Sequence, residues 1–173
     1  TMALSETNDD MEALKKKEEE RMLVAISNPE TVESLVNMAL MMREPKSKRE
    51  LLGVTVAVEY DEAKKQGKLA EQRRNLERAA RIASAVDVPM KTRCRLSTNI
   101  VSGILHTVSE MNASEIVLGL HRKHGLLDSF LGNFTQSLLN GTHRQLMIVK
   151  SLVPANVMRR IVVAVPPNAE YEA

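Results

Sequence analysis

The chain is poor in aromatic side chains and nearly balanced in charge. Of its 173 residues, two are Tyr, two are Phe and none is Trp, and Lys plus Arg (24) exceeds Asp plus Glu (22) by two. Stacking platforms for bases and a strong positive field, which nucleic-acid-binding proteins commonly use, are therefore both missing. We expect no nucleic-acid partner.

Cysteine is also scarce, since Cys94 is the only one in the sequence. A single thiol excludes an internal disulfide and a cysteine-rich zinc site, and it is typical of a reducing cytosolic compartment. We interpret Cys94 as a small residue packed in a strand. No run reaches the ~18 consecutive apolar residues that span a bilayer, and the first residues are polar and acidic, unlike a signal peptide. The chain as given is expected to be soluble.

Known catalytic motifs are missing as well. The sequence has no Gly-Lys-Ser/Thr end of a P-loop and no Ser-centred nucleophile elbow. His121 and His124 lie three residues apart, but no acidic or thiol partner is near them in the sequence. We interpret His106, which lies between Leu105 and Val108, as a partly buried structural histidine. We therefore expect no catalytic residue, no metal site and no enzymatic activity.

Short apolar runs alternate with amphipathic segments along most of the chain. The runs predict strands at 22–26, 51–58, 90–96, 116–119 and 146–149. The segments between them predict helices that begin at Asn28 and span 69–86, 97–111 and 134–139, with a polar connection at 59–68. This alternation predicts an α/β fold with a five-stranded parallel sheet, helices on both faces and right-handed crossovers.

Basic residues recur at every second position of the third predicted strand, namely Lys91, Arg93 and Arg95. Side chains with this spacing lie on one face of a strand. The pattern is compatible with a basic binding stripe, but a solvated or partly covered sheet face is the interpretation that we favour.

The sequence divides into three parts. Residues 1–20 form a charged lead-in or linker, 21–151 form the α/β domain, and 152–173 form a linker. Arg21-Met-Leu-Val-Ala-Ile recurs as Arg160-Ile-Val-Val-Ala-Val, about one domain length later. We predict that this second run is the first strand of a second copy; alternatively, residues 161–165 add a strand to the edge of the same sheet.

The segment 119–140, GLHRKHGLLDSFLGNFTQSLLN, lies where the fourth strand is followed by a helix. This is the usual phosphate-binding position of an α/β protein. Here the sequence resembles the universal stress protein family, from about Arg21 to Val149. Nucleotide-binding members of that family carry Gly, two residues, Gly, nine residues, Gly, then Ser or Thr, and Gly119, Arg122, Gly132 and Asn133 fall at these positions.

Three departures from the family pattern concern the ligand. Arg122 replaces the second glycine, Asn133 replaces the hydroxyl residue, and Ser27 stands where nucleotide-binding members have Asp. A Cβ at position 122 blocks a close approach of the backbone, whereas its guanidinium could pair with phosphate oxygens. Ser27 only partly replaces the hydrogen-bonding capacity of a carboxylate.

The resemblance implies an adenine nucleotide alpha hydrolase-like α/β fold, the universal stress protein fold, and a site for ATP or another adenine nucleotide. We expect this site at the carboxyl ends of the strands, with a helix that begins near Gly132 offering its free amides. The candidate ligand-binding residues are Ser27, Val56, Gly119, Arg122, Gly132, Asn133, Phe134 and Thr135. The resemblance also implies a homodimer that pairs through the last strand.

The charged lead-in and the partial second copy are similar to the cytoplasmic tails of bacterial cation/proton (sodium/hydrogen) antiporters. The implied function is a non-catalytic regulatory or sensor domain, covalently linked to a transporter domain in the inner membrane. One alternative is a free-standing cytosolic universal stress protein that dimerises and binds ATP. Another is a nucleotide-hydrolysing or adenylating relative of the same α/β superfamily, but the catalytic residues that such an enzyme needs are absent from the sequence.

Overall fold

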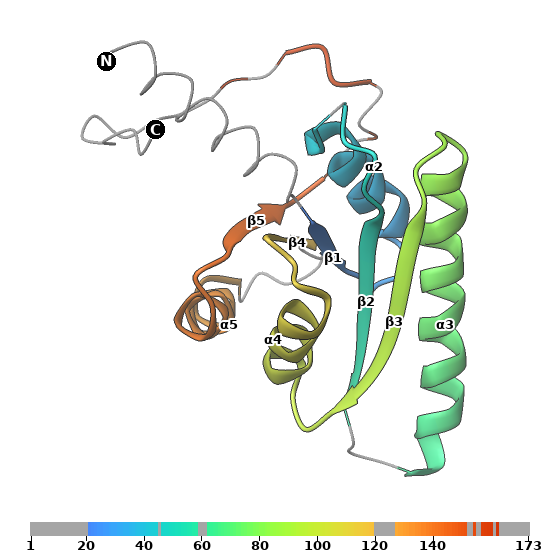
Figure 1. Ribbon diagram of the computed structural model, residues 1–173. Coiled ribbons are helices and arrows are strands. Elements are labelled where there is room, and N and C mark those ends of the chain that lie inside the picture. The colour runs from blue at the N-terminus through green and yellow to red at the C-terminus, as the bar shows by residue number, and fades with distance from the viewer. Residues whose placement is uncertain are drawn as a thin grey trace, which may run out of the picture.

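The computed structural model describes residues 21–44, 46–58, 62–119 and 127–151, together with 154, 157–160 and 162. Strands and helices alternate along these residues (Figure 1). Their bounds are β1 Met22–Ala25, α2 Val32–Met42, β2 Leu51–Val58, α3 Glu62–Ser84, β3 Met90–Ser97, α4 Ile100–Met111, β4 Glu115–Gly119, α5 Leu127–Gly141 and β5 Gln145–Val149. Among the described residues, no helix is long and apolar enough to cross a membrane.

The five strands form one parallel sheet in the order β3-β2-β1-β4-β5. The predicted five-stranded parallel sheet is therefore confirmed. β1 lies in the middle, where Leu23 is in register with Leu52 of β2 and with Ile116 of β4. In Figure 1, β2 and β3 run side by side while β5 is turned away from them, as the twist of a parallel sheet requires.

Helices cover both faces of the sheet, as predicted. α2 and α3 pack on one face, and α4 and α5 pack on the other (Figure 1). Successive residues of β1 point to opposite faces. Val24 therefore joins the α2/α3 core and Leu23 joins the α4/α5 core, and both are fully buried. Burial of each such side chain stabilises the fold by about 1.5–3 kcal/mol.

Glycine sets the distance between α4 and the sheet. A Cβ on Gly103 of α4 would lie 2.5 Å from Cγ1 of Val56 on β2 and 3.2 Å from Cβ of Ser97. These separations are below van der Waals contact, so the helix approaches β2 this closely only because residue 103 has no side chain.

Three predicted helix starts are wrong. α2 begins at Val32 with Thr31 as its N-cap. Asn28 does not cap the helix, because its side chain accepts a bond from the Glu30 amide in the turn before α2. α3 begins at Glu62, so most of the predicted polar connection at 59–68 is helical; its charged residues are good helix formers even without an apolar stripe. α5 begins at Leu127, seven residues before the predicted start at Phe134. The remaining boundaries agree to within a few residues.

The basic residues of β3 are paired with acidic residues of neighbouring elements. Lys91 lies 4.0 Å from Glu50, and Arg93 and Arg95 both pair with Glu110 of α4. This is the partly covered sheet face that we favoured over a binding stripe. Cys94, on the opposite face of β3, is partly buried against the α2/α3 core, as expected of a packed residue.

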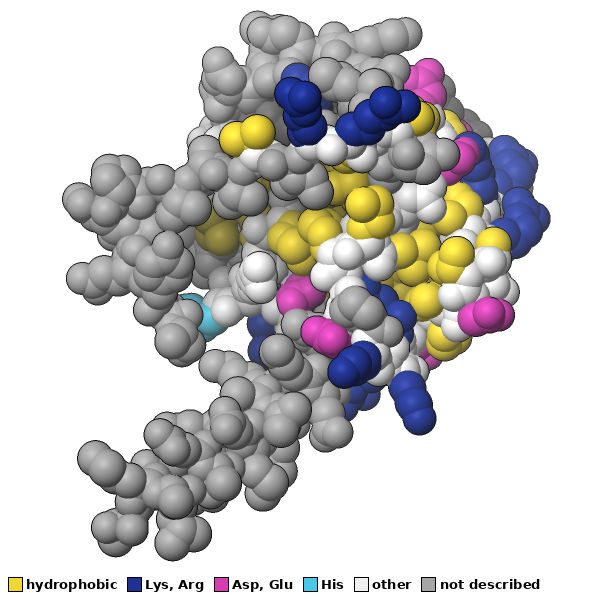
Figure 2. All heavy atoms as spheres, turned by 90° about the horizontal axis from the view of Figure 1, so that it is seen from above, with side chains coloured by type: hydrophobic (Ala, Val, Ile, Leu, Met, Phe, Trp, Pro, Cys, Tyr) yellow, Lys and Arg dark blue, Asp and Glu magenta, His cyan; other side chains and the backbone are white. Residues whose placement is uncertain are grey.

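An apolar groove lies beside β5, which is an edge strand of the sheet. It is lined by Met38 and Met42 of α2, residues 147–149 of β5, Lys150, Ser151 and Met158. Seen from above, hydrophobic side chains gather in the middle of the molecule and basic side chains lie near its rim (Figure 2). Of the predicted strand 161–165, only Val162 is among the described residues; it is 91% exposed and outside any strand, so this residue does not cover the edge.

Candidate functional site

The strand order places a topological switch point between β1 and β4. The chain passes from β1 to β2 and β3 on one side, and then crosses to β4 and β5 on the other. In parallel sheets, ligands bind beyond the carboxyl ends of the two strands at such a point. Ala25 is in register with Leu118, so Ser27 and Gly119 both lie near this end of the sheet.

The loop after β1 is held by its own backbone bonds. The Ile26 amide donates to the Val54 carbonyl over 2.7 Å, which fixes the end of β1 against β2. The Asn28 side chain accepts from the Glu30 amide over 2.9 Å, and the Asn28 carbonyl accepts from the Thr31 amide over 3.1 Å. Ser27, directly before this turn, is exposed. Its hydroxyl is thus on an ordered turn and open to a ligand.

The first turn of α2 adds backbone donors next to Ser27. The first amides of a helix have no intrahelical acceptor, and the Thr31 side chain makes no capping bond to them. The helix end therefore offers donors and a partial positive charge at the switch point. Sequence reasoning placed this helix end at Asn28 and so missed the position of these amides. Thr31 was the available signal, because Thr is a common N-cap residue.

Arg78 of α3 connects the loop after β1 to α2. It donates to the Pro29 carbonyl over 3.1 Å and to Glu33 Oε2 over 3.0 Å. Both members of the ion pair are about half exposed, so the pair contributes at most about 1 kcal/mol. Its main effect is to order the turn that carries Ser27.

Gly119 is the last residue of β4 and lies against Leu35 of α2. A Cβ at this position would lie 3.2 Å from Cδ2 of Leu35, which is buried in the first turns of α2. The absence of a side chain therefore lets α2 pack close to the carboxyl end of β4. This contact brings the two sides of the switch point together.

Val56 of β2 contacts helices on both faces of the sheet. Its side chain packs under α4 at Gly103, and its carbonyl accepts a bond from Gln72 Nε2 of α3 over 3.1 Å. Sequence reasoning missed Gln72. Its spacing of four residues to Leu76, which is buried, would have placed it on the buried face of α3.

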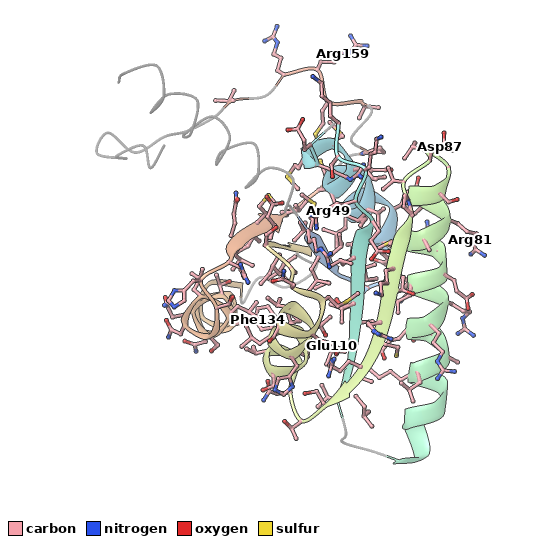
Figure 3. The ribbon with its side chains drawn as sticks, in the orientation of Figure 1. Arg49, Arg81, Asp87, Glu110, Phe134 and Arg159 are labelled. Atoms are coloured by element: carbon pink, nitrogen blue, oxygen red, sulfur yellow. The ribbon has the colours of Figure 1, made fainter. Side chains whose placement is uncertain are left out.

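The segment 132–135 is not at a helix start. It occupies the second turn of α5, where the Asn133 carbonyl accepts from the Ser137 hydroxyl over 2.7 Å. Gly132 and Asn133 are exposed, Thr135 is half-buried, and Phe134 packs against the α4/α5 core, beside α4 (Figure 3). The amides of α5 without an intrahelical partner are instead those at 127–129.

Arg122, which replaces the second glycine of the family pattern, lies outside the described residues. His121 and His124 also lie outside them. His106 is exposed, so its interpretation as a partly buried histidine is wrong; it lies on the side of α4 that faces away from Ile104 and Val108. Within the part of the chain that the structure describes, no three His, Cys, Asp or Glu residues are grouped so that they could hold a metal ion.

Solved structures share this fold at low sequence identity. A universal stress protein family member from Burkholderia pseudomallei is 18% identical with a TM-score of 0.60, and the similarity covers 76% of this chain and 96% of that one. A universal stress protein from Archaeoglobus fulgidus, solved in complex with dAMP, is 12% identical with a TM-score of 0.54 over 75% and 96%. A universal stress protein solved in complex with cAMP is 14% identical with a TM-score of 0.55 over 75% and 95%.

No curated protein matches the chain significantly. The sequence model of the universal stress protein family matches residues 19–150, which is most of the chain and includes every strand and helix described above. The protein therefore belongs to the universal stress protein family.

Proposed function

We propose that this domain is a non-catalytic regulatory module that binds an adenine nucleotide at the carboxyl ends of β1 and β4. The observation that supports this most strongly is the convergence of Ser27, Gly119 and the first turn of α2 at the switch point of the sheet. Structures of family members with dAMP and cAMP favour an adenine nucleotide as the ligand class.

Each part of the site has a distinct role in this proposal. The Ser27 hydroxyl hydrogen-bonds the ribose or the base, and the uncapped amides of α2 favour a negatively charged group. The amides at 127–129 of α5 bind phosphate, in place of the amides near Gly132. The Val56 carbonyl has a second lone pair beside its bond to Gln72 and accepts from the ligand.

The family pattern also implies ligand contacts at Gly132, Asn133, Phe134 and Thr135, but this segment lies within α5, so phosphate is bound at the start of the helix instead. Arg122 remains a proposed ligand contact. If its guanidinium pairs with phosphate, Arg122→Ala weakens ATP binding by about 1–3 kcal/mol. If Arg122 blocks the site, Arg122→Ala and, more strongly, Arg122→Gly create binding. Calorimetric titration of ATP with Mg²⁺ into the wild type and both variants tests this, since tight binding that neither substitution changes would contradict both roles.

The wider setting that we propose is the cytoplasmic domain of a bacterial cation/proton antiporter, in which ligand binding adjusts transport. The charged segment 1–20 and the repeated run at 160–165 support this setting. The alternative is a free-standing cytosolic universal stress protein that dimerises and binds ATP. The gene decides between them, because about ten or more apolar helices encoded in the same reading frame are required for the antiporter.

We also propose a homodimer that forms at the β5 edge. Ile148 of β5 is 44% exposed and Met42, Val157 and Met158 are exposed close to the same groove. An edge strand with free backbone groups and apolar side chains is a template for pairing with a second chain. A partner's β5 would cover both the backbone edge and the apolar groove.

A further inference from the structure

Three buried side chains between α3 and β2 each have a polar atom without a hydrogen-bond partner. Thr55 of β2 is 1% exposed, and Gln72 and Asn75 of α3 are 6% and 5% exposed. Within the described part of the chain, Thr55 Oγ1, Gln72 Oε1 and Asn75 Nδ2 make no hydrogen bond. Thr107 is also buried, on the other face of the sheet, but its hydroxyl has hydrogen-bond partners. It donates to the Gly103 carbonyl and accepts from Arg95.

The fold brings these three side chains to one place. Side chains two residues apart on a strand share a face, and a Cβ on Gly53 would point at Leu76 of α3, so Thr55 also faces α3. Gln72 and Asn75 are three residues apart and adjacent on one helix face. Gln72 Nε2 lies 3.1 Å from the carbonyl of Val56, the residue next to Thr55.

The hydrogen-bonding requirements of the three atoms are complementary to one small neutral molecule. Gln72 Oε1 needs a donor, Asn75 Nδ2 needs an acceptor, and the Thr55 hydroxyl takes either role. The orientation of Gln72 is fixed, because a flipped amide would place its oxygen against the Val56 carbonyl. A bare cation would be opposed by the Asn75 amide protons, and an anion by Gln72 Oε1. Water meets all three requirements at once.

We propose that Thr55, Gln72 and Asn75 bind one buried water molecule that joins α3 to β2. Buried waters typically make about three hydrogen bonds to polar groups that lack other partners, which matches this set. The water fixes Gln72 and, through it, the carbonyl of Val56 at the edge of the ligand site. This last consequence rests on the proposed function, whereas the water site itself does not.

Thr55→Val tests the site by the sign of its effect on stability. Valine has nearly the shape of threonine without the hydroxyl. If the hydroxyl holds a water, its loss weakens the site and lowers the Tm by on the order of 3–10 °C. If the hydroxyl is simply buried without a partner, its removal raises the Tm, and this result would overturn the proposal. Thr92→Val, the same change on the neighbouring strand β3 where Thr92 is partly buried, is the matched control and should alter the Tm little.

A crystal structure of the unmodified chain gives the direct test and needs no variant. The expected result is a density peak within about 2.7–3.2 Å of at least two of the three atoms. A direct bond between Gln72 and Asn75, or no peak at that place, would overturn the proposal. Neither result measures nucleotide affinity. The absence of the water would therefore not contradict nucleotide binding, and the absence of nucleotide binding would not contradict the water site.

Discussion

Arg95 of β3 donates a hydrogen bond from Nε to Oγ1 of Thr107 on α4 over 3.0 Å. The same guanidinium pairs with Glu110 one turn further along α4, while Arg93 reaches Glu110 at 3.6 Å. Thr107 is fully buried, so this contact joins an edge strand to a core helix. Among the basic residues of β3, Arg95 thus contributes to the stability of the domain.

Arg95 and Arg93 should differ in their contribution to stability although they share a strand and a face. We expect Arg95→Ala to cost about 1–2 kcal/mol, because it removes a bond to a buried hydroxyl. Arg93→Ala removes only a half-exposed ion pair and should cost less than about 0.5 kcal/mol. Urea unfolding measures both, and equal losses would show that the bond to Thr107 adds nothing.

Gly103→Ala should destabilise the domain by about 1–3 kcal/mol, because its Cβ would overlap Val56 at 2.5 Å. Val56→Ala in the same chain should recover part of this loss by removing the clashing methyl groups. Gly67→Ala is the control: Gly67 lies in α3 with no atom within 4 Å of its Cβ position, so alanine should stabilise by about 0.5–1 kcal/mol. The close packing would be contradicted if Gly103→Ala were no less stable to unfolding than Gly67→Ala.

Gly132→Ala separates the two interpretations of the segment 132–135. In the structure, Gly132 lies within α5 with open space around its Cβ position. Alanine should therefore stabilise the helix by about 0.5–1 kcal/mol and leave nucleotide affinity unchanged. A tenfold or greater loss of affinity in calorimetry would instead show that the backbone at Gly132 approaches the ligand, as the family pattern implies.

The proposed dimer depends on the exposed apolar side chain of Ile148 on β5. Ile148→Glu places a charge at the pairing edge, and we expect it to convert a dimer to a monomer at tens of micromolar in sedimentation velocity. Val86→Glu, at another exposed apolar position just after α3, is the matched control and should leave the dimer intact. A monomeric wild type would contradict the proposal directly.

The centre of the sheet was predictable because β1, β2 and β4 are short apolar runs buried on both faces. The helix starts were not predictable in this way, and at α2 local bonds compete. Asn28 has the chemistry of an N-cap but is used in a turn, and Thr31 takes its place. Gly132 suggested a helix start, yet a helix tolerates glycine when neighbours such as Phe134 and Leu138 pack in the core.

The candidate site was predictable only in part. The switch point follows from the strand order, and it placed Ser27 and Gly119 at the same end of the sheet. The bond of Gln72 to Val56 and that of Arg95 to Thr107 each join residues of different elements, so no local pattern indicates them. Such contacts depend on how α3 and α4 pack on the sheet.

An adenine nucleotide, in our proposal, binds at the carboxyl ends of β1 and β4. The most direct test is amide NMR of the ¹⁵N-labelled chain during titration with ATP and Mg²⁺, because it locates binding without any substitution. We predict saturable shifts that are largest at Ser27, Asn28, Gly119 and residues 127–129, and small at Lys91 and Arg93 on β3. No shift at millimolar ATP, or shifts centred on β3, would contradict the account.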